Sequence, residues 1–273
     1  MRYSAALLTL VASPVALAQT QSKCDPTKQL NCPSDPAFGA QKVDCDFTHG
    51  ACNPIKEADG TTIEYGKDGA VFAIKKAGDA PTVESSNYIF FGHIDVDLKI
   101  APGNCIVTSV VLQSDDLDEI DLEWLGGQPN KVQTNYFRRG DDGTYDRGRT
   151  HDVSDATGTF HTYSIDWTPD AIHWSIDGTV IRTVTKAEAD PKFPQTPMRV
   201  KLGTWTPGPS ASPGTIQWAG NGNLADFSQS PFNAYYRSVS IVDYAGGSAA
   251  TDKSVKEYVY GDQSGSKDSI RVQ

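Results

Sequence analysis

Short runs of β-branched and aromatic residues follow one another along most of the chain, and most of them alternate apolar and polar residues. A period of two is the pattern of a strand that buries one face. Gly, Pro, Asn and Asp separate the runs, Asp177-Gly178 marks a two-residue hairpin, and residues 186–190 have a short helical pattern. The predicted strands are residues 70–75, 88–100, 106–113, 119–125, 132–137, 159–167, 172–176, 180–184, 199–205 and 235–242. Because no strand–helix–strand rhythm is present, we predict an all-β, antiparallel sandwich.

The composition limits the partners of such a sandwich. A length of 273 residues, 38% of them hydrophobic, suits one large all-β domain with a real core. The chain has 34 acidic and 24 basic residues, a formal net charge of −10. Duplex nucleic acid and anionic membrane surfaces require a basic footprint, so we expect neither as a partner.

The first 18 residues have the pattern of a secretory signal peptide. Arg2 supplies a positive charge before an apolar run, and residues 16–18 form a small-residue cleavage pattern. No later segment approaches the roughly 20 apolar residues that a membrane-spanning helix needs. We therefore predict a secreted protein without a transmembrane segment. Residues 263–273 are predicted to form a polar C-terminal tail, which is either frayed or the start of a linker.

Cysteine usage agrees with an oxidising compartment. Cys24, Cys32, Cys45 and Cys52 cluster after the predicted cleavage site, and four such cysteines are expected to form two disulfides. Three pairings are open, of which we prefer the nearest-neighbour pairing, Cys24–Cys32 and Cys45–Cys52. Cys105 lies in an apolar run and is predicted to be a small buried side chain.

One predicted strand is unusually acidic. From Glu119 onward, acidic residues alternate with apolar ones, so Glu119, Asp121 and Glu123 share one face of the strand. Like charges this close raise one another's pKa and destabilise the fold, which indicates a catalytic role. The alternatives are a solvated acidic strand and a Ca²⁺ ligand set, although a Ca²⁺ loop normally includes a glycine-bearing turn.

The spacing of the two glutamates suits a retaining glycosidase. Cα atoms four residues apart on a strand are about 13 Å apart. Side chains that lean together can bring the carboxyl groups to about 5–6 Å, the separation that retaining enzymes use. One carboxylate would attack the anomeric carbon, while the other holds a proton because its pKa is raised. Asp121 can hydrogen-bond the nucleophile and help to hold the two pKa values apart.

The acidic strand resembles the E-x-D-x-E signature of glycoside hydrolase family 16. Residues 118–126, 132–137, 160–170 and 176–178, with the N-terminal stretch from Cys24 through residues 32–39, are similar to the fungal Crh-type branch. The resemblance implies a concanavalin-like β-jelly-roll sandwich with a concave carbohydrate-binding sheet. It also implies a cell-wall transglycosylase that joins chitin to β-glucan, with Glu119 as nucleophile, Glu123 as general acid/base and Asp121 as the assisting carboxylate.

The expected organisation has four parts. The signal peptide (1–18) precedes a disulfide-stapled segment (19–55) that packs on the catalytic domain (56–262), and the polar tail (263–273) follows. The resemblance implies a cell-wall location, with a GPI anchor only if the native chain is longer.

Sugar sites combine aromatic platforms with planar polar groups. Gln133, Asn135 and Phe137 share one face of the strand that follows the acidic one, and we predict that they contact substrate. Lys201 and Trp205 share the polar face of strand 199–205. Trp205 is predicted to be a stacking platform, with a place at the core edge as the alternative.

Residues 215–218 are predicted to form a further mixed strand. Thr215 and Gln217 would contact sugar from its polar face, whereas Trp218 suits the core equally well.

Three functions stay open on the sequence: a retaining transglycosylase, a hydrolytic β-glucanase or chitinase with the same site, and a non-catalytic jelly-roll lectin. Binding alone does not call for the pair Glu119 and Glu123, which disfavours the lectin. The five histidines have no metal-ligand spacing, so no metal and no cofactor are expected. We expect a monomer whose partners are polysaccharides, with chitin as donor and β-glucan or a chitin oligomer as acceptor.

Overall fold

The computed structural model describes residues 22–141, 143 and 146–273, so the predicted signal peptide lies outside the described residues. Three sheets contain the named strands. The seven-stranded sheet has the order β11 (Arg149–Asp152), β10 (Lys131–Phe137), β9 (Glu119–Leu125), β8 (Val107–Ser114), β15 (Met198–Trp205), β6 (Thr82–Ser85) and β3 (Ile55–Glu57). The eight-stranded sheet has the order β14 (Thr179–Thr185), β13 (Ala171–Ile176), β12 (His161–Trp167), β7 (Gly92–Lys99), β16 (Phe232–Asp243), β5 (Gly69–Ile74) and β4 (Glu64–Gly66), with β2 (Val43–Asp46) also paired to β16. The small sheet has the order β1 (Asp35–Pro36), β17 (Glu257–Tyr260) and β18 (Ile270–Val272).

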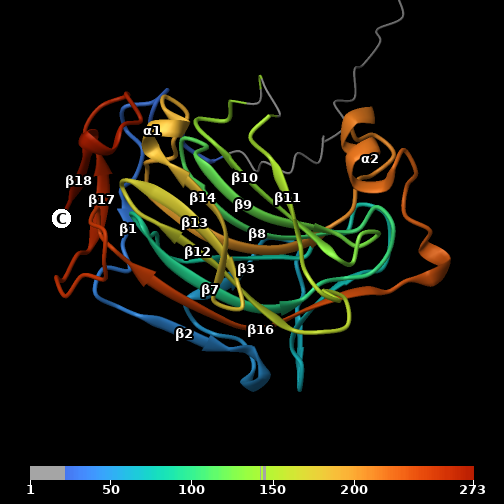
Figure 1. Ribbon diagram of the computed structural model, residues 1–273. Helices are drawn as coiled ribbons and strands as arrows, with labels where there is room; N and C mark the ends of the chain where they lie inside the picture. The colour runs from blue at the N-terminus through green and yellow to red at the C-terminus, as the bar shows by residue number, and fades with distance from the viewer. Residues whose placement is uncertain (1–21, 142, 144–145) are drawn as a thin grey trace, which may run out of the picture.

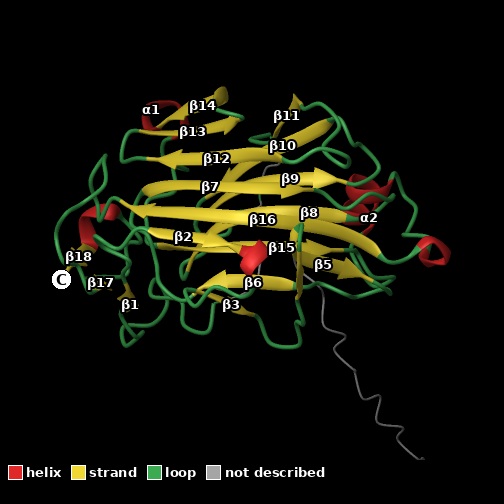
Figure 2. Cartoon of the chain, turned by 90° about the horizontal axis from the view of Figure 1, so that it is seen from below, coloured by secondary structure: helices red, strands yellow, loops and turns green. Residues whose placement is uncertain are grey.

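The two large sheets pack face to face, with β8, β9 and β10 above β7, β12 and β16 in Figure 1. Figure 2, which looks from below, shows that the strands of the two layers run nearly along the same direction. The pairings within both sheets are antiparallel. The helical elements are η1 (Phe47–His49), α1 (Lys186–Ala189), α2 (Pro213–Gly220), η2 (Phe227–Gln229) and η3 (Lys267–Ser269). The predicted antiparallel sandwich is confirmed.

The core lies between these two sheets. In β9, Ile120, Leu122 and Trp124 are fully buried, because the alternating pattern turns every second residue inward. Each such side chain contributes about 1.5–3 kcal/mol when it leaves water. From the opposite sheet, the indole Nε1 of Trp174 donates a hydrogen bond to the backbone carbonyl of Asp121 at 3.1 Å. The acidic strand β9 is therefore held by its neighbours in the seven-stranded sheet and by Trp174 of the opposite sheet.

The predicted strand at residues 88–100 begins later than the sequence pattern suggests. β7 starts at Gly92, while Tyr88 and Ile89 make only isolated bridges. Phe91 has a φ of 58°, in the left-handed region that a continuous strand cannot include. The apolar run is thus divided by backbone geometry rather than by a polar residue.

The predicted strand at residues 215–218 is wrong, because these residues lie in the helix α2. The side chain of Ser212 caps its N-terminus by accepting from the backbone N–H of Thr215, and Pro213 occupies the first turn. Asn221, in the left-handed conformation, ends the helix. Ser-Pro before a short apolar run is a helix-start signal, and it outweighs the alternation of polar and apolar residues here.

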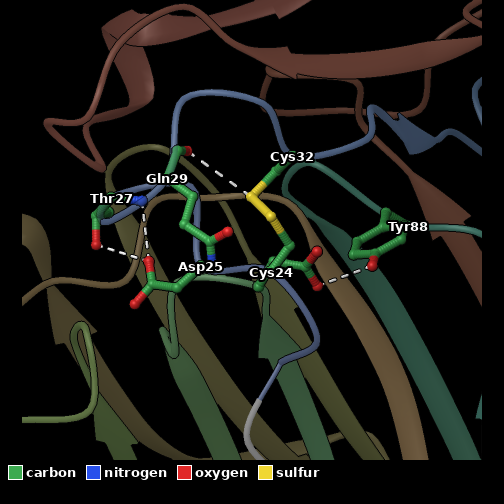
Figure 3. The surroundings of a disulfide bond; sticks show 7 residues. Cys24, Asp25, Thr27, Gln29, Cys32 and Tyr88 are labelled. Atoms are coloured by element: carbon green, nitrogen blue, oxygen red, sulfur yellow. Dashed lines mark hydrogen bonds between the residues drawn. A yellow bond between two sulfur atoms is a disulfide. The ribbon is translucent and has the colours of Figure 1, made fainter.

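The N-terminal segment is held by the disulfides Cys24–Cys32 and Cys45–Cys52, which is the nearest-neighbour pairing. Figure 3 shows the first of these loops, in which the backbone N–H and hydroxyl of Thr27 donate to Asp25. The second disulfide starts from β2, which pairs with β16 of the large sheet. Cys105 is buried and is a free thiol.

The C-terminal residues 263–273 are not a frayed tail. They include η3 and β18, and β18 pairs with β17, so backbone hydrogen bonds order a segment whose side chains are polar. Ile270 is buried and gives the segment an apolar anchor, a single residue that the polar composition obscures.

Candidate active site

The three acidic side chains of β9 lie on the face of the seven-stranded sheet that points away from the core. Directly opposed residues of antiparallel strands share a face, so the register identifies their neighbours. We call this surface the carboxylate face. Its central members are Glu119, Asp121 and Glu123 of β9, Phe137, Asn135 and Gln133 of β10, Gln113, Val111 and Ser109 of β8, and Lys201 and Gly203 of β15.

The sequence therefore placed the β10 residues correctly relative to the acidic strand. Gln133 is opposite Glu123, Asn135 is opposite Asp121 and Phe137 is opposite Glu119. Gln133 and Asn135 are half-buried, whereas Phe137 is buried.

Burial raises the pKa of all three acids, and repulsion from neighbouring acids adds to the shift of Asp121 and Glu123. Glu119 and Asp121 are 6% and 2% exposed, and Glu123 is half-buried. The pKa of Asp121 lies well above its usual range because it is buried beside Glu119 and Glu123, and its hydrogen bond to Glu119 favours a proton on Asp121. Burial and the charge of Glu119 raise the pKa of Glu123 to about 8.

Glu119 has a different environment from the other two acids. Burial raises its pKa, but hydrogen bonds from Asp121 and Gln113 and the charge of Lys201 act in the opposite direction. The Nε2 of Gln113 donates to Glu119 Oε2 at 2.7 Å. Glu119 is therefore the acid that ionises first, while Glu123 keeps its proton to higher pH. Such an asymmetry, with one ionised and one protonated carboxyl four residues apart, is what a nucleophile and a proton donor require.

The helix α2 stands over the Glu123 end of the carboxylate face, above one end of β8 in Figure 1. Cys105, Val107, Leu125 and Ala219 form a small buried cluster that anchors the helix to the sheet. Beside this cluster, Trp205 and Trp218 stack with ring centroids 6.0 Å apart at an interplanar angle of 28°.

Both tryptophans are half-buried, so an edge of this stacked pair is open to solvent. Trp218 Nε1 donates to Gln133 Oε1 at 2.9 Å, and Gln133 is the cross-strand partner of Glu123. The tryptophan pair is thus linked directly to the cross-strand neighbour of Glu123. The sequence pattern suited Trp218 equally to the core and to the surface. Because residues 213–220 form a helix and not a strand, Trp218 reaches Gln133.

The other predicted sugar contacts have different surroundings. The Thr215 hydroxyl lies 2.8 Å from Ser212 Oγ at the helix start, and Gln217 is exposed on α2. Lys201 Nζ donates to Gln113 Oε1 at 2.7 Å, so this side chain contacts a neighbouring residue of the sheet.

Arg147 is a member of the site that sequence reasoning missed. Its guanidinium lies over the Phe137 ring at 5.0 Å, and the residue is 7% exposed. A buried guanidinium thus covers Phe137, the cross-strand neighbour of Glu119. Its place in a connecting loop gave no periodic signal.

Within the described part of the chain, no group of three or more His, Cys, Asp or Glu side chains is arranged to hold a metal ion. No described helix is long and apolar enough to cross a membrane.

Comparisons with known proteins agree with this geometry. The sequence pattern of glycosyl hydrolases family 16 matches residues 51–220. Crh-like protein 5 from Aspergillus fumigatus is 45% identical over 273 residues, which cover 99% of this chain and 66% of that protein. The chain thus spans just under two thirds of the length of this relative.

Two solved structures show how widely the fold is shared. A Crh5 transglycosylase in complex with NAG superposes with a TM-score of 0.84 at 45% identity, covering 92% of this chain and 100% of that one. A Bacillus licheniformis β-glucanase superposes with a TM-score of 0.61 at 23% identity, covering 73% of this chain and 97% of that one, and shows the fold alone. The predicted jelly-roll sandwich is confirmed.

Proposed function

Because the chain belongs to glycosyl hydrolases family 16, and within it to the Crh-like proteins, we propose that it is a retaining transglycosylase of the fungal cell wall. The observation that carries the proposal is the asymmetry of the carboxylate face. Glu119 is stabilised as a carboxylate by two hydrogen-bond donors, and Glu123 holds a proton up to about pH 8. A lectin requires no such difference between two acids on one strand.

In the first step, the Glu119 carboxylate attacks the anomeric carbon of the donor sugar. A carbon–oxygen bond to Glu119 forms as the glycosidic bond breaks, and Glu123 gives its proton to the departing oxygen. The reducing-end fragment leaves as an alcohol. Asp121, which holds its proton against Glu119, donates a hydrogen bond that stabilises the carboxylate before attack and as it leaves again.

In the second step, Glu123 is a carboxylate and acts as a base. It removes the proton from an acceptor hydroxyl, whose oxygen attacks the anomeric carbon and releases Glu119. If the acceptor is a sugar hydroxyl, the product is a transferred chain, and if it is water, the product is a shortened chain. Both outcomes retain the anomeric configuration.

We assign substrate contacts to both ends of the carboxylate face. The Trp205–Trp218 pair offers an aromatic platform beside Glu123, and Gln133 and Asn135 offer amides to sugar hydroxyls. Phe137, whose ring is covered by the Arg147 guanidinium, lies at the Glu119 end of the carboxylate face. Thr215 and Gln217 extend the contact along α2.

Small side chains leave space beside Glu123. Ser109 is its neighbour on β8 and Gly203 follows on β15, so a sugar ring can approach from that side of the strand.

The proposed donor is chitin, and the proposed acceptor is β-glucan or a chitin oligomer. NAG, the ligand in the similar Crh5 structure, is the repeating unit of chitin, which supports this choice of donor. A residual chitinase activity follows when water takes the place of the acceptor. The alternative is a hydrolytic β-glucanase or chitinase, in which water is the normal acceptor.

We also propose that the protein acts as a monomer, secreted to the cell wall. The two disulfides and the predicted signal peptide support an extracellular location.

Incubation with a chitin oligosaccharide and a fluorescent β-glucan oligomer tests the function. Fluorescent products longer than the acceptor, sensitive to chitinase digestion, are expected. Shortened chitin chains without labelled hybrids would favour hydrolysis, and unchanged sugars would favour a lectin.

A further inference from the structure

Three side chains from three adjacent strands form one hydrogen-bonded line on the carboxylate face. Lys201 Nζ of β15 donates to Gln113 Oε1 of β8 at 2.7 Å. Gln113 Nε2 in turn donates to Glu119 Oε2 of β9 at 2.7 Å. Lys201 is half-buried, whereas Gln113 and Glu119 are 4% and 6% exposed.

The direction of these bonds is set by the chemistry of lysine. An ammonium group has donors and no acceptor, so the amide oxygen of Gln113 must face Lys201. The amide NH₂ of Gln113 then necessarily faces Glu119. Without the lysine, rotation of the amide by 180° would present its oxygen to the carboxylate and remove a donor from Glu119.

We propose that Lys201 is a positioning residue which, through the Gln113 amide, holds Glu119 as an ionised nucleophile. The proposal rests on the proposed function and deepens it. The sequence analysis predicts that Lys201 contacts sugar; the proposed role concerns its hydrogen bond to Gln113, on the strand β8 that lies between β15 and β9. Hydrogen bonds to the charged form of an acid favour that form, and a charged donor strengthens the next bond in the line.

The other charged groups around Glu119 do not reproduce this effect. Asp121 and Glu123 lie on the same strand and carry negative charge when ionised. Arg199, on the same strand face as Lys201, pairs with Glu84 of β6 at 2.8 Å and lies over the Tyr88 ring at 4.7 Å. From β10, Phe137 is apolar, and the Arg147 guanidinium above it is separated from Glu119 by that ring.

The test compares Lys201→Met with Lys201→Arg and with Arg199→Met. Arg199 lies opposite Gln113 and pairs with Glu84, so this control removes a nearby positive charge while the side chains of Lys201, Gln113 and Glu119 are all kept. Transfer activity is measured across pH with the chitin oligosaccharide and fluorescent acceptor. In Lys201→Met, kcat/KM is expected to fall about tenfold or more, less than the loss caused by removing a direct transition-state donor. Loss of the line raises the pKa of Glu119, so the acidic limb of the profile moves to higher pH, by about one pH unit.

Lys201→Arg keeps a donor-only cation and is expected to restore part of the activity and of the acidic limb. Arg199→Met is expected to leave the acidic limb in place. The pKa of the Glu119 carboxyl, followed by ¹³C NMR, gives a readout independent of turnover. It is expected to rise in Lys201→Met and to stay unchanged in Arg199→Met.

An unchanged Glu119 pKa and an unchanged acidic limb in folded Lys201→Met would overturn the proposal, and so would an equal shift in Arg199→Met. If the wild-type protein transfers no sugar, the proposed function fails instead. The NMR comparison still decides whether Lys201 controls the ionisation of Glu119.

Discussion

Two strands of this protein carry almost the same alternation of acids, one in each large sheet. β9 has Glu119, Asp121 and Glu123, and β7 has Asp95 and Asp97 between fully buried apolar residues. On β7 the acids face the outside of the eight-stranded sheet and have partners. Asp95 contacts His93 at 3.0 Å and accepts from Ser164 at 2.6 Å, and Asp97 pairs with Arg237 at 3.0 Å.

The electrostatic outcome of the two patterns differs. The hydrogen bond from His93 lowers the pKa of Asp95, and burial raises the pKa of Asp97 although the charge of Arg237 acts against the rise. On β9, burial and repulsion between the acids both raise the pKa of Asp121 and Glu123. An alternating acidic strand is therefore compatible with a stabilising ion-pair network and with a reactive site. The side chains on the neighbouring strands decide which one results.

The largest expected difference between the strands is in turnover. Glu119→Gln should reduce transfer and hydrolysis about a thousandfold or more, because the amide cannot form the glycosyl-enzyme. Asp95→Asn, the matched acid-to-amide change on β7, should leave kcat/KM within about twofold of wild type. Steady-state kinetics on both variants checks this. Near-normal turnover by Glu119→Gln would contradict the nucleophile assignment.

A smaller effect is expected from Asp121. Asp121→Ala removes the hydrogen bond that the protonated carboxyl donates to Glu119, so kcat should fall about ten- to hundredfold with little change in KM. Asp97→Ala, the matched change on β7, is the control and should keep its activity. Equal kcat values for the two variants would show that Asp121 has no assisting role.

The pH dependence of activity tests the raised pKa of Glu123 on β9. Glu123 must be protonated for the first step, and its pKa is raised to about 8, so activity should decline as pH rises through about 8.

The raised pKa of Glu123 also affects stability. Ionisation of Glu123 destabilises the fold as pH rises above the pKa that this side chain has in the unfolded chain. Glu123→Gln should therefore have a higher Tm than wild type near pH 8 and the same Tm near pH 4. A lower Tm at pH 8 would show that burial of Glu123 carries no electrostatic cost.

The smallest effect concerns stability on the β7 side. Hydrogen bonds to Asp166 and then Asp95 raise the pKa of His93 to about 9. A raised histidine pKa contributes stability that is fully present below the unfolded value of 6.5 and is lost as pH rises through about 9. His93→Gln should thus lower Tm at pH 6 and not at pH 10, with activity retained. Chemical or thermal unfolding at the two pH values checks this, and a pH-independent difference would contradict it.

The sequence predicted what depends on local periodicity. The alternation of residues 119–125 gave the strand, the face and the three acids, since side-chain direction in a strand follows from the backbone alone. It gave the β10 residues as well, because β10 follows β9 directly and pairs with it. Alternation alone predicts a strand for β7 as it does for β9; the acids of the two strands differ in number, in burial and in their cross-strand partners.

Features that depend on distant pairing could not be predicted in this way. The line from Lys201 to Glu119 requires the register of β15 on β8, which joins segments almost ninety residues apart by their numbers. Trp218 reaches Gln133 only because residues 213–220 form a helix. β18 is ordered by its pairing to β17, although its composition resembles that of a loose terminus.

The central claim is that Glu119 becomes covalently bound to the donor sugar. Glu123→Ala, incubated with a chito-oligosaccharyl fluoride, tests it most directly. Fluoride needs no proton to leave, so the bond to Glu119 can form, and without Glu123 the acceptor is not activated and the adduct accumulates. Peptide mapping by mass spectrometry is expected to place the sugar on Glu119. An adduct on another residue, or continued turnover with no adduct, would contradict the account.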